Sequence, residues 1–310
     1  MTFAFVFPGQ GSQSVGMMQP FADSVAVRAV FAEASATLGQ DLWKLVEEGP
    51  PEALSATVNT QPLMLTAGYA VYHAWRDAGG AEPSVMAGHS LGEYTALVAA
   101  GALVFRDALP LVRFRAQAMQ EAVPMGEGAM AAILGLEDGA VRTACEEAAQ
   151  GQVVEPVNFN APSQVVIAGH RAAVERGVAL AKAKGAKRAM MLPVSAPFHS
   201  SLLRPAAEKL AAYLRSVAVT APRIPVINNV DVAVEQESQR IKEALARQAS
   251  SPVRWVEIVR RFAANGVSHV AECGPGKVLA GLARRIDDGL QSHALTDPQS
   301  LQQALLALKS

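Results

Sequence analysis

The chain contains 310 residues, of which 50% are hydrophobic and 18% are charged, and its formal net charge at pH 7 is −1. A chain of this length and composition can bury a large core, which excludes an intrinsically disordered protein. The near-zero net charge argues against nucleic acid as a partner, because binding to phosphates is driven by an excess of basic residues.

The N-terminal segment predicts a buried strand rather than a signal peptide. Apolar residues occupy positions 3–7 and end at Pro8, with no basic segment before them. No stretch of the chain reaches the ~18 uninterrupted apolar residues that a membrane span needs. We therefore expect a cytoplasmic protein with no membrane partner. Its two cysteines, Cys145 and Cys273, lack metal-ligand spacing and predict neither a metal site nor a disulfide, which fits a reducing compartment.

A glycine-rich turn, residues 8–13, follows the first strand and contains Gln10. The turn lacks the third glycine of a dinucleotide-binding fingerprint, because Ser14 occupies that position. A glycine-flanked backbone N–H at the carboxyl end of a strand is instead a candidate oxyanion donor, which predicts that role for Gln10. Helices are expected next over residues 24–38 and 63–78, where apolar residues recur three and four apart.

The strand predicted over residues 84–87 leads into the most informative segment, Gly88-His89-Ser90-Leu91-Gly92, and a helical segment follows it. Strand, Gly-x-Ser-x-Gly and helix is the layout of a nucleophile elbow, whose tight turn exposes a serine hydroxyl at the carboxyl edge of a sheet. Ser90 is therefore the candidate nucleophile. The backbone N–H of Leu91, at the N-terminus of the helix, is a second candidate oxyanion donor.

A further helix, expected from Asp107 to about residue 123, carries Arg113 and Arg115. Because they are two residues apart on a helix, the two side chains face roughly opposite directions, and one can enter a pocket while the other faces solvent. A buried arginine needs an anion. A substrate carboxylate would supply it through paired hydrogen bonds, and a structural salt bridge to a neighbouring acid is the alternative.

Residues 125–195 show a different pattern, which predicts a small inserted subdomain. Strand, helix, strand, strand, helix, strand is the order of ferredoxin-like folds. Gly126 and Gly128 precede these elements and Pro193 and Pro197 follow them, where two crossings to a main domain are expected. The predicted elements cover residues 129–134, 138–149, 153–158, 164–168, 172–184 and 188–192.

Residues 196–310 return to alternating strands and helices and complete the main domain together with residues 1–124. This alternation implies a mostly parallel sheet covered by helices on both faces. The predicted fold class is α/β, with an α/β-hydrolase-like catalytic domain and an inserted ferredoxin-like α+β subdomain. The last elements are expected near residues 202–217, 225–228, 238–248, 253–264, 268–272, 277–285 and 294.

His199 is the best candidate for the base that a nucleophilic serine needs. It lies in a non-helical segment, residues 193–200, whose two prolines would hold an imidazole in place. A loop histidine without a catalytic role is the alternative. No acid between Ser90 and His199 lies at a clear strand end, so the sequence predicts a Ser–His dyad in which a backbone carbonyl could hold the imidazole. The other histidines lie beside the nucleophile or on expected helices and strands: His73, His89, His170, His269 and His293.

The chain carries, in order, Phe7-Pro8-Gly9-Gln10-Gly11-Ser12-Gln13, Gly88-His89-Ser90-Leu91-Gly92-Glu93-Tyr94, Arg115 with Met119-Gln120-Glu121-Ala122, Asn158-Phe159-Asn160, Phe198-His199 and Gly274-Pro275-Gly276-Lys277-Val278-Leu279. In this combination the motifs resemble those of malonyl-CoA:acyl carrier protein transacylases. The resemblance runs from residue 3 to about residue 285 and covers nearly the whole chain.

The resemblance implies a ping-pong transfer of malonyl without a cofactor. Ser90 would attack the thioester of malonyl-CoA, with His199 as the base and then as the acid toward the leaving thiolate. The malonyl group would then pass to the phosphopantetheine thiol of an acyl carrier protein. Gln248, expected beside the substrate, would orient His199 through its backbone carbonyl, which accounts for the missing acid.

The resemblance also implies which residues surround the substrate. Arg115 would bind the free malonyl carboxylate, and the backbone N–H groups of Gln10 and Leu91 would form the oxyanion hole. Asn160, in a matching motif, is expected to line the site. Leu91 and Phe198 are similar to the residues of malonyl-selective members, and Phe198 would narrow the pocket against an α-methyl group, worth ~1–3 kcal/mol of discrimination.

Carrier proteins are acidic, so a basic docking face is expected on this near-neutral chain. Lys187, Arg188, Arg284 and Arg285 are the clusters that could form it, and a solvated surface is the alternative. We expect a monomer that supplies fatty acid synthesis, although a polyketide pathway would use the same chemistry.

Three other functions stay open on the sequence. A serine esterase or thioesterase would share the elbow and the base but would deliver the acyl group to water. The malonyl-loading subunit of a malonate decarboxylase would share the first half-reaction. A scaffold that binds carrier proteins without catalysis is the third, and the complete set of Ser90, His199, Arg115 and Gln10 argues against it.

Overall fold

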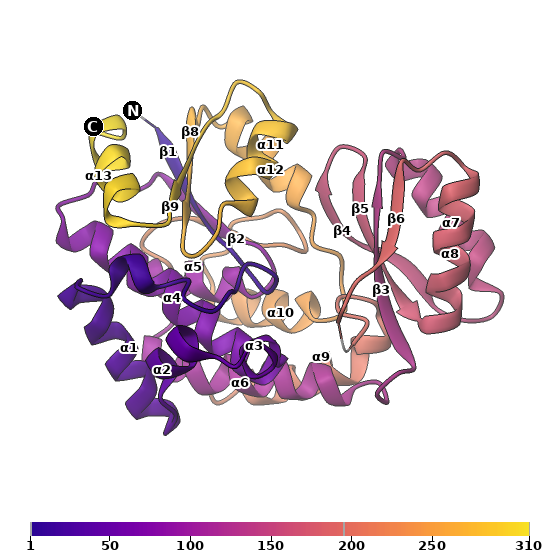
Figure 1. The fold of residues 1–310 in the computed structure, drawn as a ribbon, viewed down its shortest axis with the longest axis horizontal. Coiled ribbons are helices and arrows are strands. Elements are labelled where there is room, and N and C mark those ends of the chain that lie inside the picture. Colours follow the sequence, from indigo (N-terminus) through magenta and orange to yellow (C-terminus); the bar gives the residue numbers. More distant parts are fainter. Residues whose placement is uncertain (1, 195, 310) are drawn as a thin grey trace.

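Two β-sheets organise the computed structural model, which describes residues 2–194 and 196–309 (Figure 1). The larger sheet has five strands in the order β7-β2-β1-β8-β9, and all its pairs are parallel. The parallel sheet predicted from the alternation of strands and helices is therefore confirmed. Its strands are β1 (Phe3–Phe7), β2 (Val85–Gly88), β7 (Val226–Ile227), β8 (His269–Cys273) and β9 (Gln291–Leu295).

Helices occupy most of the chain between these strands. The sequence pattern does not predict α2, α3 or α13, and α4 begins at Thr57 rather than at residue 63 and continues through Pro62. The helices of this part are α1 (Val25–Leu38), α2 (Leu42–Glu48), α3 (Pro51–Ser55), α4 (Thr57–Asp77), α5 (Gly92–Ala99), α6 (Phe105–Glu121), α9 (Arg204–Leu214), α10 (Ser238–Gln248), α11 (Trp255–Ala264), α12 (Val278–Ile286) and α13 (Pro298–Ala307), with 3-10 turns at η1 (Gln19–Phe21) and η2 (Ser201–Leu203).

Helices cover both faces of the large sheet. Successive side chains of a strand point to opposite faces, so an uninterrupted apolar strand needs a packing partner on each face. Phe3, Phe5 and Phe7 of β1 belong to the core that also contains buried residues of α1, α4, α5 and α6. Ala4 and Val6 pack on the other side, with the apolar residues of α11 and α12. Every residue of β1 is buried, which explains why this strand is apolar without interruption.

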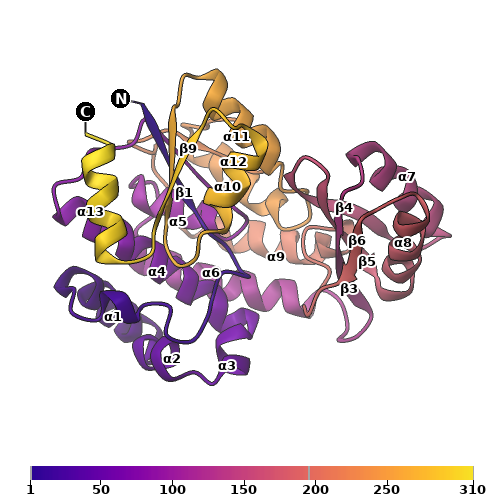
Figure 2. The same cartoon turned by 45° about the horizontal axis from the view of Figure 1, so that its top comes forward.

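The smaller sheet has four antiparallel strands in the order β4-β5-β3-β6. Its elements follow in the predicted order, strand, helix, strand, strand, helix, strand. Figure 2 shows this sheet at one end of the molecule, with two helices on its outer side. The elements are β3 (Gly128–Leu134), α7 (Asp138–Ala149), β4 (Val154–Ala161), β5 (Gln164–His170), α8 (Arg171–Ala183) and β6 (Arg188–Met191).

The two faces of the small sheet have different partners. Ala131, Ile133 and Val165 pack under α7 and α8, whereas Met130 and Val166 belong to the core of the large sheet. The division into residues 1–124 with 196–310 and 125–195 stays a prediction, and its boundary residues 1, 195 and 310 lie outside the described part of the chain. Within the described residues, no helix is both long and apolar enough to cross a membrane.

Candidate active site

The turn after β2 holds Ser90 in a strained backbone conformation at the carboxyl edge of the large sheet. Its φ angle is 52°, in the left-handed region that non-glycine residues rarely adopt. Glycines on both sides make the turn possible. A Cβ added to Gly88 would lie 1.8 Å from the carbonyl carbon of Gly92, and a Cβ added to Gly92 would lie 2.0 Å from the carbonyl oxygen of Phe7. Strand and helix can approach this closely because neither glycine has a side chain.

Asn229, in the segment after β7, holds the same turn. Its Oδ1 accepts a hydrogen bond from the backbone N–H of Ser90 at 2.7 Å, and its Nδ2 donates to the carbonyl of Gly88 at 2.7 Å. The Asn229 side chain is fully buried. These bonds satisfy two backbone groups of the strained turn and fix the direction of the serine.

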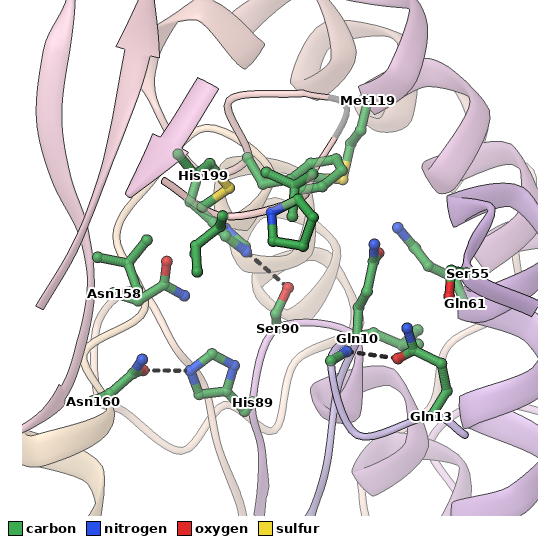
Figure 3. Close-up of a pocket in the computed structure, with 18 of the residues that line it drawn as sticks. Gln10, Gln13, Ser55, Gln61, His89, Ser90, Met119, Asn158, Asn160 and His199 are labelled. Carbon is green, nitrogen blue, oxygen red and sulfur yellow. Dashed lines mark hydrogen bonds between the residues drawn. The ribbon is translucent and has the colours of Figure 1, made fainter. Parts of the chain in front are cut away.

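His199 contacts the Ser90 hydroxyl from the loop that follows β6 (Figure 3). Ser90 Oγ lies 2.7 Å from His199 Nε2, and His199 Nδ1 lies 2.8 Å from the backbone carbonyl oxygen of Gln248. A carbonyl only accepts, so Nδ1 carries the proton and Nε2 can accept the proton of Ser90. Burial, reinforced by the charge of Arg115, lowers the pKa of His199 to about 3. The imidazole is therefore neutral at physiological pH, as a general base must be.

Arg115 of α6 brings a positive charge to the same hydroxyl. The residue is 2% exposed. Its Nη2 donates to Ser90 Oγ at 3.1 Å and to Gln248 Oε1 at 2.9 Å, and its Nη1 donates to Gln61 Oε1 at 2.8 Å. Within the described residues, no carboxylate forms an ion pair with Arg115, and its Nε has no hydrogen-bond partner. The site thus contains a buried cation that an anionic ligand could pair with.

A cavity of about 520 Å³ opens over Ser90, within the size range of small-molecule sites. Its walls come from the elbow, α6 and the turn after β1 on one side, and from the small sheet on the other. Gln248 does not line it but forms hydrogen bonds with three residues that do, Ser90, Arg115 and His199. Of the predicted site residues, those that line the cavity are Gln10, Ser90, Leu91, Arg115, Asn160, Phe198 and His199.

The turn after β1 packs directly against the elbow. A Cβ added to Gly9 would lie 2.5 Å from the carbonyl oxygen of His89 and 3.7 Å from the backbone nitrogen of Leu91. Among the described residues, the backbone N–H groups of Gln10 and Leu91 have no hydrogen-bond acceptor. Leu91 also lies at the N-terminus of α5, where the helix dipole favours negative charge. Two unused donors beside a nucleophile can stabilise an oxyanion.

Comparisons with known proteins show which family this chain resembles. The family model described as acyl transferase domain matches residues 4–301. The malonyl CoA-acyl carrier protein transacylase of Escherichia coli (strain K12) is 57% identical over 304 residues, which are 98% of this chain and 98% of that protein. This chain belongs to the malonyl CoA-acyl carrier protein transacylase family. It is an acyltransferase, as the elbow and the base predict.

Solved structures agree with this family. The crystal structure of the acyl-carrier-protein S-malonyltransferase from Burkholderia pseudomallei 1710b is 65% identical to this enzyme, with a TM-score of 0.98 over 99% of this chain and 100% of that one. A malonyl-transacylase solved in complex with a type II PKS acyl-carrier protein is 51% identical, with a TM-score of 0.98 over 99% and 100% of the two chains. The predicted fold class is therefore confirmed.

Asn160 and Phe198 line the cavity of this acyltransferase in different ways. Asn160 Oδ1 lies 2.8 Å from His89 Nε2 (Figure 3), so its amide oxygen already has one partner within the protein. Phe198 precedes the base in sequence and is buried. Their contacts with substrate stay predictions.

The four basic residues predicted to dock a carrier protein lie outside the cavity lining. Lys187 and Arg188 are exposed at the start of β6, and Arg284 and Arg285 are exposed at the end of α12. Arg285 donates a hydrogen bond to the side chain of Gln164 at the start of β5. Since Arg188 lies at the same end of the small sheet as Gln164, the fold brings both clusters to one region of the surface.

Three residues of the site network are absent from the sequence prediction. Asn229 follows a strand at the carboxyl edge of the sheet, and Glu93 lies in the first turn of the helix after the nucleophile. Both positions are signals that the sequence carries. Gln61 lies within α4 beside Pro62 and has no comparable local signal, because only the packing of α4 against α6 brings it to Arg115.

Proposed function

We propose that this enzyme transfers a malonyl group from malonyl-CoA to the phosphopantetheine thiol of an acyl carrier protein, through a malonyl ester of Ser90. The observation that carries the proposal is Arg115, a buried cation 3.1 Å from the nucleophilic hydroxyl and without a carboxylate partner among the described residues. An acyl group with its own carboxylate would pair with it. The names of the relatives agree with this substrate.

In the first half-reaction, Ser90 Oγ attacks the thioester carbon while its proton passes to His199 Nε2. The carbonyl oxygen becomes an oxyanion, which the N–H groups of Gln10 and Leu91 stabilise. When the C–S bond breaks, the proton on Nε2 passes to the sulfur of CoA. Malonyl-Ser90 and CoA thiol remain, and His199 is neutral again.

In the second half-reaction, the thiol of the carrier arm replaces the thiol of CoA. His199 takes the thiol proton as the sulfur attacks the ester carbon of malonyl-Ser90. The C–O bond then breaks, and Ser90 Oγ takes the proton back from Nε2. The backbone carbonyl of Gln248 keeps the imidazole in one tautomer and one orientation throughout both steps.

Mass spectrometry of the acyl-enzyme tests this function. The enzyme is mixed with equal concentrations of malonyl-CoA, methylmalonyl-CoA and acetyl-CoA, and the intact protein is weighed before and after addition of holo-carrier protein. We expect mainly a malonyl adduct that persists in water and disappears when carrier is added. A predominant acetyl adduct, or an adduct lost to water as fast as to carrier, would contradict the proposal.

We further propose that the enzyme works as a monomer in the cytoplasm and supplies extender units for fatty acid synthesis. Cys145 and Cys273 are both unpaired and buried, which fits a reducing compartment. Leu91 and Phe198 border the site of the acyl group, and we propose that they favour malonyl over methylmalonyl.

Docking of the acidic carrier is proposed to use Lys187, Arg188, Arg284 and Arg285. Reversing the charge of either pair should slow transfer to the carrier by about 10-fold at low salt, because complementary charge governs mainly the rate of encounter. Loading from malonyl-CoA should stay within about 2-fold of the unchanged enzyme, and salt should weaken the effect. The two half-reactions are timed separately.

A control variant separates docking from net charge. Arg215→Glu with Lys242→Glu changes the net charge by the same amount as either pair, on the groove between α9 and α10. We expect this control to transfer malonyl to the carrier at the normal rate. Equal slowing of both half-reactions, or no slowing in the pair variants, would assign the four residues to ordinary solvated surface.

A further inference from the structure

Glu93 is a buried carboxylate that the steps above do not use. It lies in the first turn of α5 and is 2% exposed. Its Oε2 accepts a hydrogen bond from the side-chain Nε2 of Gln248 at 2.8 Å and another from the backbone N–H of Asn229 at 2.9 Å. Both donors belong to residues that touch the elbow or the base. Glu93 is therefore linked to the site without lining its cavity.

Gln248 connects Glu93 to the base and to the guanidinium of Arg115. Its backbone carbonyl accepts from His199 Nδ1, and its side-chain Oε1 accepts from Arg115 at 2.9 Å. Its Nε2 donates to the backbone carbonyl of Ser90 at 3.0 Å as well as to Glu93. The residue is completely buried. One residue thus joins the elbow, the base and the guanidinium.

The amide of Gln248 has a donor nitrogen and an acceptor oxygen, and its orientation decides which of the two faces the guanidinium of Arg115. Glu93 Oε2 accepts the backbone N–H of Asn229 and so acts as an acceptor, which requires the Nε2 end of the amide. The Oε1 end then faces Arg115. A flipped amide would set oxygen against the carboxylate of Glu93 and N–H against the guanidinium, and both contacts would be repulsive.

The charge of the buried guanidinium also acts on Glu93. Burial raises the pKa of Glu93 to about 7, and its bonds from Asn229 and Gln248 and the charge of Arg115 oppose that rise. The two charges do not touch, because the amide of Gln248 lies between them. The guanidinium is therefore held in place while its unpartnered Nε stays unused within the described residues.

We propose that Glu93 is a positioning residue for acyl-group selection: it fixes the amide of Gln248, and through it holds Arg115 where the free carboxylate of the acyl group arrives. The inference rests on the proposed malonyl transfer. It distinguishes Glu93 from a residue that merely stabilises the fold, because loss of the hydrogen-bond acceptor at this position should affect carboxylated acyl groups far more than neutral ones.

The test compares malonyl and acetyl loading of Ser90 in the full-length variants Glu93→Met, Glu93→Asp and Glu93→Gln. In Glu93→Met the acceptor is lost, and in Glu93→Asp it is drawn back by one methylene. For both we expect the malonyl-to-acetyl ratio to fall about 10- to 100-fold, the range for hydrogen bonds to charged groups. The KM for malonyl-CoA should rise, while the kinetics with acetyl-CoA stay nearly constant. In Glu93→Gln the amide oxygen can still accept both bonds, so the ratio should stay within about 3-fold of the unchanged enzyme.

Glu272 provides the matched control. It is another fully buried carboxylate, its Oε2 accepts the backbone N–H of Ala280 at 2.9 Å, and it does not line the cavity. Glu272→Met should lower the melting temperature without changing the malonyl-to-acetyl ratio. Equal loss of malonyl and acetyl loading in Glu93→Met or Glu93→Asp, or a Glu93→Gln variant as poor as Glu93→Met, would overturn the inference. Failure of the unchanged enzyme to load malonyl would instead reject the proposed function.

Discussion

Replacing Ser90 with alanine is expected to abolish the acyl-enzyme and to lower malonyl transfer by about 10⁴- to 10⁶-fold, as removal of a catalytic serine does elsewhere. The hydroxyl is the group that His199 Nε2 and Arg115 Nη2 both contact, at 2.7 and 3.1 Å. Without it, neither has a nucleophile to act on. The measurement is the intact mass of the protein after mixing with malonyl-CoA, together with the rate of malonyl-carrier formation.

The fold should tolerate this change, because the strained turn is held by Asn229 through backbone groups of Ser90 and Gly88 rather than through the hydroxyl. The melting temperature of Ser90→Ala should therefore stay near that of the unchanged enzyme. Ser216→Ala, at an exposed serine after α9, is the control and should load malonyl normally. Malonylation that persisted in Ser90→Ala would remove Ser90 as the nucleophile.

Replacing Arg115 with alanine is expected to remove the preference for malonyl. Loss of a buried partner of a charged group costs about 2–5 kcal/mol, which corresponds to a decrease in malonyl loading of about 30- to 4,000-fold. Acetyl loading does not need the guanidinium and should be maintained or increase. The measurement is the rate of formation of each acyl-enzyme, with the two thioesters tested separately and in competition.

Arg113 is the natural control for this experiment. It lies on the same helix but donates to the backbone carbonyl of Leu38 and to the side chain of Gln40, away from the cavity. Arg113→Ala should therefore change stability without changing the choice of acyl group. If Arg115→Ala transferred malonyl at the normal rate, Arg115 would be a structural residue and the proposed substrate would lose its main support.

Long apolar or strongly periodic segments account for the part of the fold that could be predicted. Residues 3–7 are buried on both faces of the sheet, so their uninterrupted apolar run predicts a central strand. Helices α2 and α3 are too short to show a helical period, although Asp41 caps the first and Pro51 begins the second. Helix α13 also carries a start signal, because Asp297 and Ser300 form a capping box with Pro298 at the first turn.

For the site, the sequence predicts residues with intrinsic chemistry better than residues that act through contacts. Ser90 carries a local motif, and His199 lies in a loop constrained by prolines. Gln248, by contrast, orients the base through a backbone carbonyl at the end of a helix, which any residue type could supply. Its side-chain contacts with Arg115 and Glu93 form only when the chain folds, so the residue is implied by family resemblance alone. Asn229 and Glu93 acquire their partners only when β7, α5 and α10 come together.

The groups around Ser90 come from distant parts of the chain, since the cavity is lined by Gln10, Ser90, Arg115 and His199, and Gln248 closes the network behind them. Contacts between residues so far apart in sequence require the closure of long loops, which is slow and costly in entropy. A chain in which any one of these segments is not packed in place lacks the complete set. The fraction of chains that take up a malonyl group therefore reports the fraction that is correctly folded. It is a stricter measure of refolding yield than helix content, which a partly folded chain can also show.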